Sequence, residues 1–275
     1  MASGYARTAG ERLASRLLAR APRHAEAHLD ERSFWEHRWA ERIAYLERHG
    51  APFEGHDSWQ GWISQTMCRH YFRLLGGDVT GCRAIELGSG SGFVSLLLAQ
   101  RGAEVTLVDF APTAIAYSQR IAAALGVAAR AVFRCQDMFD LPAAGAFDFA
   151  FNSGVAEHYR FEQAVALVRV MAGAVRPGGL VSVTIPNLLS PELLWRMARE
   201  GKMSERYVSL RELRAVLEAA GLRQVHTAAT NTIAPSFLPM PLVRGVAALR
   251  PHRWLGRFAF LVTGFGIRPA LEDES

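Results

Sequence analysis

Residues 84–92 read AIELGSGSG, an apolar run that leads into three alternating glycines. The run predicts a buried strand over 83–87, and the apolar spacing after it predicts a helix over 93–100. Glycine at 88, 90 and 92 suits a tight strand-to-helix turn, because glycine adopts backbone conformations barred to other residues and lets a ligand approach closely. The start of the helix offers unpaired N–H groups to a polar ligand. This stretch therefore predicts an α/β fold with a ligand at the turn.

The spacing of this turn separates two kinds of nucleotide site. A dinucleotide fingerprint reads G-x-G-x-x-G, whereas residues 86–92 read acid-x-G-x-G-x-G, with Glu86 two residues before the first glycine. A carboxylate there can reach the cationic amino group of a methionine moiety, directly or through water, which favours S-adenosylmethionine over NAD. A tight turn without a ligand is the alternative. The residues of the turn expected to contact the cofactor are Glu86, Gly88, Ser89, Gly90 and Gly92.

Beyond Cys82 the chain alternates short apolar runs with helical patterns, which is typical of a parallel sheet with crossover helices. Further strands are expected at 104–108, 131–134, 147–151, 180–185, 224–229 and 258–265. Helices are expected at 113–125, 161–175 and 209–220. The second of these helices ends at the Arg-Pro-Gly-Gly of 176–179, which is a strong stop signal.

Acidic residues follow two of these strands. Asp109 ends the second strand, where a carboxylate can accept hydrogen bonds from both ribose hydroxyls, and Phe110 can pack beside the adenine. The alternative for Asp109 is a helix N-cap, since Pro112 suits a helix start. Asp137 follows the third strand and is placed for the adenine amino group, with Met138 lining one face of the ring. For this pair the alternative is a surface turn.

As a set, these segments resemble the class I S-adenosylmethionine-dependent methyltransferases. The resemblance rests on 84–92, Val108-Asp109, Asp137-Met138, Phe147-Asp148 and 176–179, and it covers about residues 80–230. It implies S-adenosylmethionine as cofactor and S-adenosylhomocysteine as product. It also implies a Rossmann-like α/β sheet of seven mostly parallel strands with helices on both faces. The last strand of such a sheet is antiparallel, which suits 258–265.

Residues 152–159 read NSGVAEHY and resemble the SxGVxEH variant of small-molecule methyltransferases of this class. They depart from the Asp/Asn-Pro-Pro-aromatic motif of enzymes that methylate amino groups of nucleic-acid bases or glutamine. This departure lowers the case for a nucleic-acid substrate. Asn152, Ser153 and Gly154 are expected to border the cofactor, because the carboxyl ends of the strands form the binding crevice.

His158 is the candidate catalytic base. The sulfonium methyl of the cofactor is already activated, so the protein mainly aligns an acceptor and excludes water. A base is needed only where the nucleophile arrives protonated, and an imidazole titrates near neutral pH. The alternative is that the Glu-His pair at 157 and 158 caps the next helix or packs against the cofactor site.

The remaining regions divide the chain into an N-terminal helical cap or lid, 1–80, and a methyltransferase domain, 81–275. Apolar residues at helical spacing predict one N-terminal helix that ends near Gly50 and a second, aromatic one that ends at 76–77. The first carries Phe34, Trp35, Arg38, Trp39, Ile43 and Leu46. The aromatic side chains of the second form either a lid over the site or a packed core; they are Trp59, Trp62, Tyr71 and Phe72.

Two insertions, 186–208 and 230–257, are expected near the acceptor site. The first predicts a helix, and the second, which holds four prolines, predicts an irregular segment. Candidate acceptor walls are 185–187, Trp195 and Met197. Apolar residues that suggest either a hydrophobic acceptor or a homodimer contact are Phe237, Leu238 and Met240. Basic residues that would suit a lipid acceptor at a membrane surface are Arg244, Arg250, His252 and Arg253.

Composition limits the partners and the compartment. Three dispersed cysteines without a CxxC pair argue against a disulfide scaffold or a structural zinc site, and no metal is expected. The net charge of +5 comes almost wholly from arginines spread among acids, with Lys202 the only lysine, so charge gives little support to nucleic-acid binding. No apolar run reaches the roughly 20 residues of a membrane span.

Residues 1–21 alternate arginine with alanine and leucine, without the continuous apolar segment of a secretory signal. They read either as a transit peptide or, preferably, as an amphipathic surface helix of a cytoplasmic bacterial enzyme. The leading function hypothesis is methylation of a small organic acceptor at O, N or C, in specialised or lipid and quinone metabolism. Its alternatives are an RNA or protein methyltransferase, or a protein that keeps the fold without transferring a methyl group.

Overall fold

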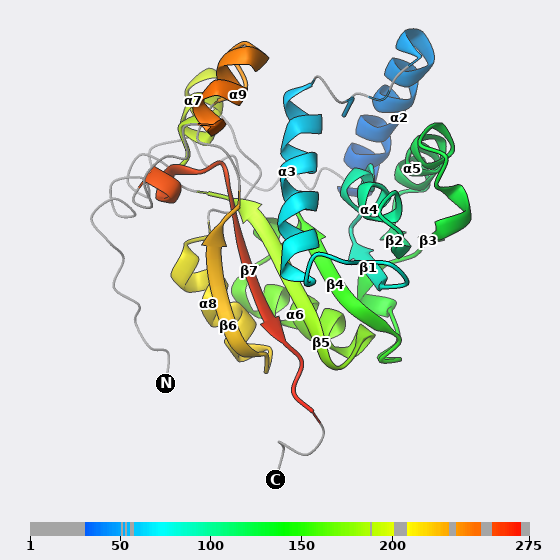
Figure 1. Ribbon diagram of the computed structural model, residues 1–275, viewed down its shortest axis with the longest axis vertical. Helices are drawn as coiled ribbons and strands as arrows, with labels where there is room; N and C mark the ends of the chain where they lie inside the picture. Colours follow the sequence, from blue (N-terminus) through cyan, green and yellow to red (C-terminus); the bar gives the residue numbers. More distant parts are fainter. Residues whose placement is uncertain are drawn as a thin grey trace.

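Seven strands form one sheet in the order β3-β2-β1-β4-β5-β7-β6 (Figure 1). The computed structural model of the protein describes residues 31–50, 52, 54–55, 58–187, 189–200, 208–230, 235–248 and 255–270. The strands are parallel except β7, which runs antiparallel to both β5 and β6. Their bounds are β1 Arg83–Leu87, β2 Glu104–Asp109, β3 Ala131–Cys135, β4 Phe147–Ser153, β5 Val175–Pro186, β6 Arg223–Ala229 and β7 Leu261–Ile267. The predicted fold class is confirmed, including its antiparallel last strand.

Helices cover both faces of the sheet, and each face has its own apolar core (Figure 1). One face carries α3 (Trp59–Leu74), α4 (Phe93–Ala99) and α5 (Pro112–Ala124); the other carries α6 (Phe161–Ala174) and α8 (Leu210–Ala219). Side chains alternate along β1, so Ala84 joins the first core while Ile85 and Leu87 join the second. Glu86 therefore belongs to the face covered by α4, which places its carboxyl group beneath the glycine turn.

The boundary between α6 and β5 differs from the prediction. The helix ends at Ala174, and Val175 is already extended and pairs with Phe147 of β4. The Arg-Pro-Gly-Gly stretch thus stops the helix as expected, but it lies within β5 instead of forming a loop before it. A register shift between Phe147 and Phe149 and the left-handed backbone of Gly178 (φ 74°) accommodate this early start.

The aromatic helix α3 is part of the first core. Tyr71 is fully buried, its ring packs 5.2 Å from Phe149 and 5.0 Å from Phe151, and its hydroxyl is 2.7 Å from Thr184 Oγ1 of β5. Trp59 is buried as well. The sequence left open whether the aromatic residues of this helix form a lid or a packed core. Tyr71 and Trp59 belong to a packed core.

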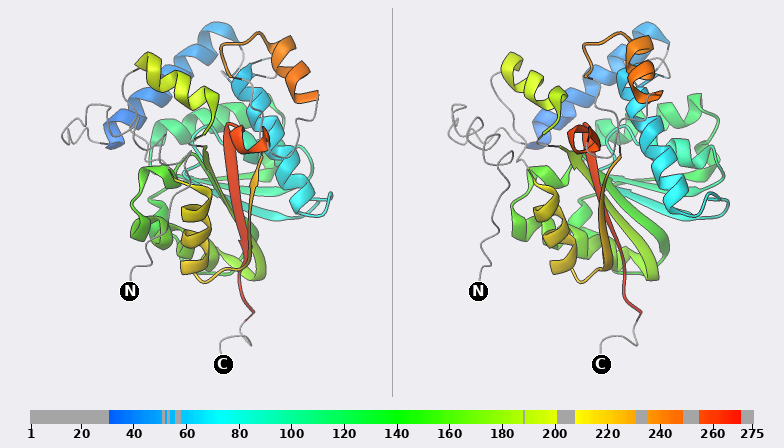
Figure 2. Two further views of the ribbon diagram at one scale, coloured as in Figure 1. Left: turned by 90° about the vertical axis from the view of Figure 1, so that its left-hand side faces the viewer. Right: turned by 60° about the vertical axis from the view of Figure 1, so that its left-hand side comes forward.

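The preceding helix, α2 (Glu31–His49), lies at the carboxyl ends of the parallel strands, packed along α5 (Figures 1 and 2). None of its described side chains is fully buried. α2 is therefore the N-terminal element positioned over the end of the sheet where ligands bind in open α/β folds.

Two further helices, α7 (Pro191–Glu200) and α9 (Met240–Ala248), lie at the same end of the molecule as α2 (Figure 2). The first confirms the predicted helix. The second corrects the prediction that 230–257 is irregular throughout, because Pro239 and Pro241 stand at the start of a helix, where proline is accepted. The carbonyl of Pro239 takes hydrogen bonds from the N–H groups of Leu242 and Val243.

Glu192 joins α7 to the segment that leads into α9. Its buried carboxylate accepts from Ser236 N at 2.6 Å, from Ser236 Oγ at 2.8 Å and from Arg196 Nε at 2.6 Å. Among the described helices, none combines the length and apolar character needed to cross a bilayer. The predictions for 1–21, the Met197 side chain, Arg250, His252 and Arg253 lie outside the described residues.

Replacement of Glu192 by Ala is expected to loosen the segment 235–248 without unfolding the sheet. The variant leaves the half-buried donors of Ser236 and Arg196 without their acceptor, which costs about 2 kcal/mol of unfolding free energy. Denaturant unfolding and limited proteolysis would measure both effects. Glu218→Ala is the control, because its ion pair with Arg214 is half exposed and is worth at most about 1 kcal/mol. Equal proteolysis of the two variants would contradict the expectation.

Candidate functional site

The three glycines of the turn between β1 and α4 all have left-handed backbones, with φ of 67°, 52° and 61° at Gly88, Gly90 and Gly92. Each also lies where a side chain would collide with a neighbour. A Cβ at Gly88 would lie 2.7 Å from Val155, one at Gly90 would lie 2.5 Å from the Trp39 ring, and one at Gly92 would overlap Leu107. Both the backbone conformation and the packing therefore require glycine at these positions, as the sequence predicts.

The turn is held to the carboxyl end of the neighbouring strand β2. The N–H groups of Gly88 and Ser89 both donate to the carbonyl of Val108, at 2.8 and 3.0 Å. The hydroxyl of Ser89 is buried in the turn and has no hydrogen-bond partner among the described residues. A buried hydroxyl of this kind is costly to leave unsatisfied, so the turn presents a polar atom that a bound ligand can satisfy.

Asp109, at the end of β2, lies directly against the glycine turn. One carboxylate oxygen accepts from Gly90 N at 2.8 Å and the other accepts from Ala111 N at 2.9 Å. Burial raises the pKa of Asp109, the two backbone hydrogen bonds oppose the rise, and the nearby charge of Glu36 adds to it. The N-cap of α5 is Ala111, not Asp109. The structure brings Asp109 to the turn as expected, and its contact with a ribose stays a prediction.

Glu86 is buried beneath the turn, and its Oε2 accepts from Ser95 Oγ of α4 at 2.6 Å. Burial raises the pKa of Glu86 to about 8, with the Ser95 hydroxyl opposing the rise and Asp109 adding to it. Sequence reasoning missed Ser95. The signal was present, because a serine within an otherwise apolar helix must find a polar partner when it is fully buried.

The end of β4 borders the same turn. Asn152 is fully buried, and its side-chain N–H donates to the carbonyl of Leu87 at 2.8 Å, while its Oδ1 has no partner in the described part of the chain. Gly154 has a left-handed backbone (φ 74°) and donates its N–H to Thr184, and Ser153 Oγ lies 3.7 Å from Met67 Sδ. The predicted residues of β4 thus stand beside the end of β1.

The residues after β3 lie next to Asp109, since the N–H of Gln136 donates to the Asp109 carbonyl. Asp137 is exposed, and its carboxylate caps a short 3₁₀ turn by accepting from Phe139 N at 2.9 Å. Met138 is buried in the core on the α6 side, and Phe110 is half buried. This geometry fits the surface-turn alternative for Asp137, and its adenine contact remains a prediction.

His158 ends a short 3₁₀ turn, Ala156–His158, that follows β4. Its half-buried ring meets the ring of Trp35 from α2 edge to face, with centroids 5.8 Å apart. The same helix places Trp39 on Gly90, as the glycine geometry shows. Sequence reasoning took Trp35 and Trp39 as the apolar stripe of a helix and missed that this stripe faces the glycine turn. Nothing local in the sequence specifies that contact.

These residues fit a bound S-adenosylmethionine. Two buried polar atoms without a partner among the described residues, Ser89 Oγ and Asn152 Oδ1, lie with the carboxyl groups of Glu86 and Asp109 and the glycine turn at the carboxyl ends of β1, β2 and β4. The polar acceptors suit the ammonium and hydroxyl groups of that cofactor, and backbone N–H groups of such a turn suit its carboxylate.

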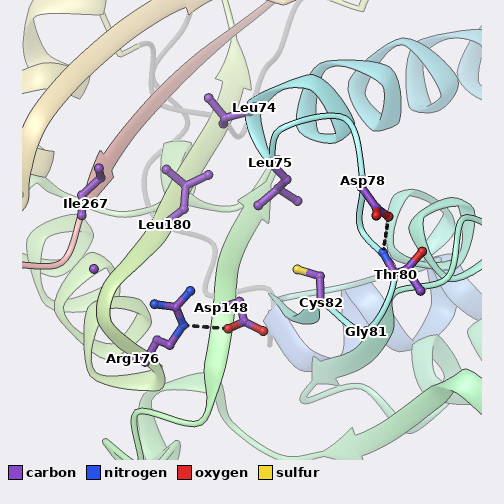
Figure 3. A pocket seen from close by; sticks show the side chains of 11 residues that line it. Leu74, Leu75, Asp78, Thr80, Gly81, Cys82, Asp148, Arg176, Leu180 and Ile267 are labelled. Atoms are coloured by element: carbon purple, nitrogen blue, oxygen red, sulfur yellow. Dashed lines mark hydrogen bonds and ion pairs between the residues drawn. The ribbon is translucent and has the colours of Figure 1, made fainter.

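A separate hollow of about 510 Å³ lies at the opposite ends of the strands, near the amino ends of β1 and β4 (Figure 3). Its wall includes Leu75, Cys82 and the ion pair of Arg176 Nε with Asp148 Oδ1, 2.8 Å apart (Figure 3). Ligands of open α/β sheets bind at the carboxyl ends of the strands, so this hollow is in the wrong place for the cofactor.

The raised pKa of Glu86 predicts a pH-dependent stability. The folded protein keeps this proton up to about pH 8, while the unfolded chain loses it near pH 4.5, so the folded state binds more protons between these values and stability falls as pH rises. Glu86→Gln removes this contribution. The unfolding free energy of the wild type minus that of the variant should therefore fall, by on the order of a few kcal/mol, between about pH 5 and about pH 8.5. Urea unfolding without cofactor measures it; a difference that stays constant with pH would rule out the burial of a titrating carboxyl here.

Comparison with known proteins identifies the family of the chain. Residues 84–179 match the family model described as a methyltransferase domain. A ubiquinone biosynthesis O-methyltransferase of Methylobacterium nodulans is 32% identical over 179 residues, which cover 60% of this chain and 70% of that protein. A protein of the same name from a second Methylobacterium strain is 32% identical over 174 residues, which cover 58% of this chain and 68% of that protein.

Solved structures show the same fold. Magnesium protoporphyrin IX methyltransferase from Synechocystis, with S-adenosylhomocysteine bound, superposes with a TM-score of 0.60 at 19% identity over 86% of this chain and 97% of that one. The predicted enzyme class, a methyltransferase, and the predicted cofactor, S-adenosylmethionine, are confirmed. The family match thus argues against the alternative of a protein that keeps the fold without transferring a methyl group. The chain belongs to the class I S-adenosylmethionine-dependent methyltransferases.

Proposed function

We propose that the protein transfers the methyl group to a hydroxyl oxygen of a small, largely apolar aromatic acceptor, of the kind found in quinone metabolism. The observation that carries the proposal is the position of His158 in the short turn that follows β4, close to the residues expected to border the cofactor. The names of the two Methylobacterium relatives, which are O-methyltransferases of ubiquinone biosynthesis, support the choice of oxygen as acceptor atom.

His158 supplies the group that an oxygen acceptor requires. A hydroxyl must lose its proton as the new carbon–oxygen bond forms, and an imidazole accepts a proton near neutral pH. The ring is half buried and meets the Trp35 ring edge to face, so this contact restrains its orientation while part of the side chain stays accessible to a ligand. An acceptor that is already a free nucleophile would have no use for such a base.

The other residues bind, orient and exclude water. Bound S-adenosylmethionine supplies a methyl group that its positively charged sulfur already activates. Glu86 and Asp109 present carboxylates to the cofactor, and Ser89 and Asn152 present the buried polar atoms that lack protein partners in the described structure. These groups fix the donor, so the remaining barrier depends on how well the acceptor is aligned.

The helices α7 and α9 support an apolar acceptor. Trp195 of α7 packs 5.1 Å from Phe237, and the guanidinium of Arg199 lies 4.4 Å from the Trp195 ring. Large apolar side chains that stay exposed on these segments are Leu194, Phe237 and Leu242. In the predicted wall at 185–187, Asn187 has a structural role. Its side-chain amide donates to the carbonyls of Arg257 and Ala259 and so connects the end of β5 to the segment before β7.

A panel of acceptors tests the proposal. With S-adenosylmethionine and catechols or hydroxybenzoates that bear apolar substituents, the purified enzyme should form S-adenosylhomocysteine and an O-methylated product, both seen by mass spectrometry. Amine and thiol analogues of the same acceptors should react much more slowly, because the proposed base serves a hydroxyl. Preference for the amines, or methylation of RNA alone, would reject the proposal.

His158→Ala is expected to lower kcat about 10²- to 10⁴-fold, far more than it weakens the binding of S-adenosylhomocysteine, because a base acts on the acceptor side. The rate of the wild type should rise with pH through the titration of an imidazole, and the variant should lose this step. His226→Ala is the control, since His226 is exposed on the edge strand β6. A variant that keeps both full turnover and the wild-type pH profile would show that His158 is not the base.

A further inference from the structure

The helix α2 bridges the two rims of the cofactor site. On the β2 side, Glu36 accepts from Thr113 Oγ1 of α5 at 2.5 Å, and Thr113 Oγ1 lies 3.1 Å from the Glu36 carbonyl. On the β4 side, Trp35 meets His158. Asp109 and the glycine turn lie between these two anchor points, because Asp109 ends the strand before α5 and His158 follows β4.

Trp39 lies against the glycine turn itself. A Cβ at Gly90 would stand 2.5 Å from Cζ2 and 2.8 Å from Cη2 of the Trp39 ring, so the indole rests directly on the backbone at the position that glycine leaves bare. The ring is also stacked on Tyr117 of α5, with centroids 6.0 Å apart and planes at 28°. The indole is therefore held in one place over the turn.

The two indoles of α2 keep apolar area available for a ligand. Trp35 and Trp39 are stacked 6.4 Å apart, and both are only half buried. α3, by contrast, buries six residues in the core, whereas α2 has no fully buried side chain among those described. The hydrogen bonds of Glu36 hold α2 in place, and its two indoles are half exposed beside the glycine turn. These are features of the wall of a binding site more than those of a core helix.

We propose that α2 is the outer wall of the cofactor site and that Trp39, supported by Trp35, packs directly on bound S-adenosylmethionine. The cofactor would then lie along the glycine turn beside the indoles and contact the part of the rings that is not covered by the protein, with Glu36 and Thr113 fixing the wall to α5. This role concerns the methyl donor only, so it does not depend on which acceptor is methylated. It also falls outside the segment 84–179 that matches the family model.

Equilibrium binding of S-adenosylhomocysteine tests this wall without any acceptor. Calorimetry should show Trp39→Ala binding about tenfold more weakly than the wild type, and Trp39→Phe less affected, since a smaller ring keeps part of the contact. Tyr45→Ala is the matched control, an aromatic of the same helix whose ring packs on His49 at 4.2 Å, and it should bind within about twofold of the wild type. Unchanged or tighter binding by Trp39→Ala, with the variant melting as the wild type does, would overturn the proposal.

Fluorescence gives a second readout that does not require the alanine variant to fold. If the indole of Trp39 contacts the cofactor, S-adenosylhomocysteine should change the tryptophan emission of the wild type, and most of this change should disappear in Trp39→Phe. Trp62→Phe, on α3, should keep it. A ligand-induced change that is equal in Trp39→Phe and in the wild type would show that α2 does not touch the cofactor, whatever the outcome of the acceptor assays.

Discussion

The site depends on one buried contact, the hydrogen bond from the N–H of Gly90 to the carboxylate of Asp109. It joins the turn after β1 to the end of β2, and the two N–H groups that donate to the Val108 carbonyl add to the same junction. Because both strands are parallel neighbours, their carboxyl ends meet there and the turn has a fixed floor. Without these hydrogen bonds the backbone of the glycine turn would not be held in one conformation, and Ser89 and Glu86 would not be positioned on the same site.

Local signals explain why so much of the fold was predictable. Alternating apolar runs and helical spacings place the seven strands, and the glycine spacing with Glu86 identifies the cofactor turn. The antiparallel position of β7 followed from the family resemblance, because no local pattern in 261–267 distinguishes its direction. The prolines at 239 and 241 led to the wrong prediction for α9. Proline usually indicates a break in a helix, but at the first positions of a helix it is accepted.

What the sequence could not provide is contact between segments far apart in the chain. The contacts of Trp39 with Gly90 and of Trp35 with His158 depend on how α2 packs along α5, and an apolar stripe on a helix does not specify which surface it meets. Ser95 differs, because a buried serine in an apolar helix does signal a polar partner, and only the identity of that partner, Glu86, depends on the turn between them. Spacing therefore predicts the elements of the site, whereas the packing of helices on its rims decides which residues complete it.

The two sides of the reaction are built by different parts of the chain. The donor side is made by strand ends and a turn whose geometry follows from the parallel sheet, and it is the part that matches the methyltransferase family model. The elements above it, α2, α7 and α9, come from outside that segment. Glu36 joins α2 to α5, and Glu192 joins α7 to the segment before α9. We therefore expect the turn to hold the methyl donor and the covering helices to select the substrate, so that the acceptor can vary on one fold while the methyl donor stays the same.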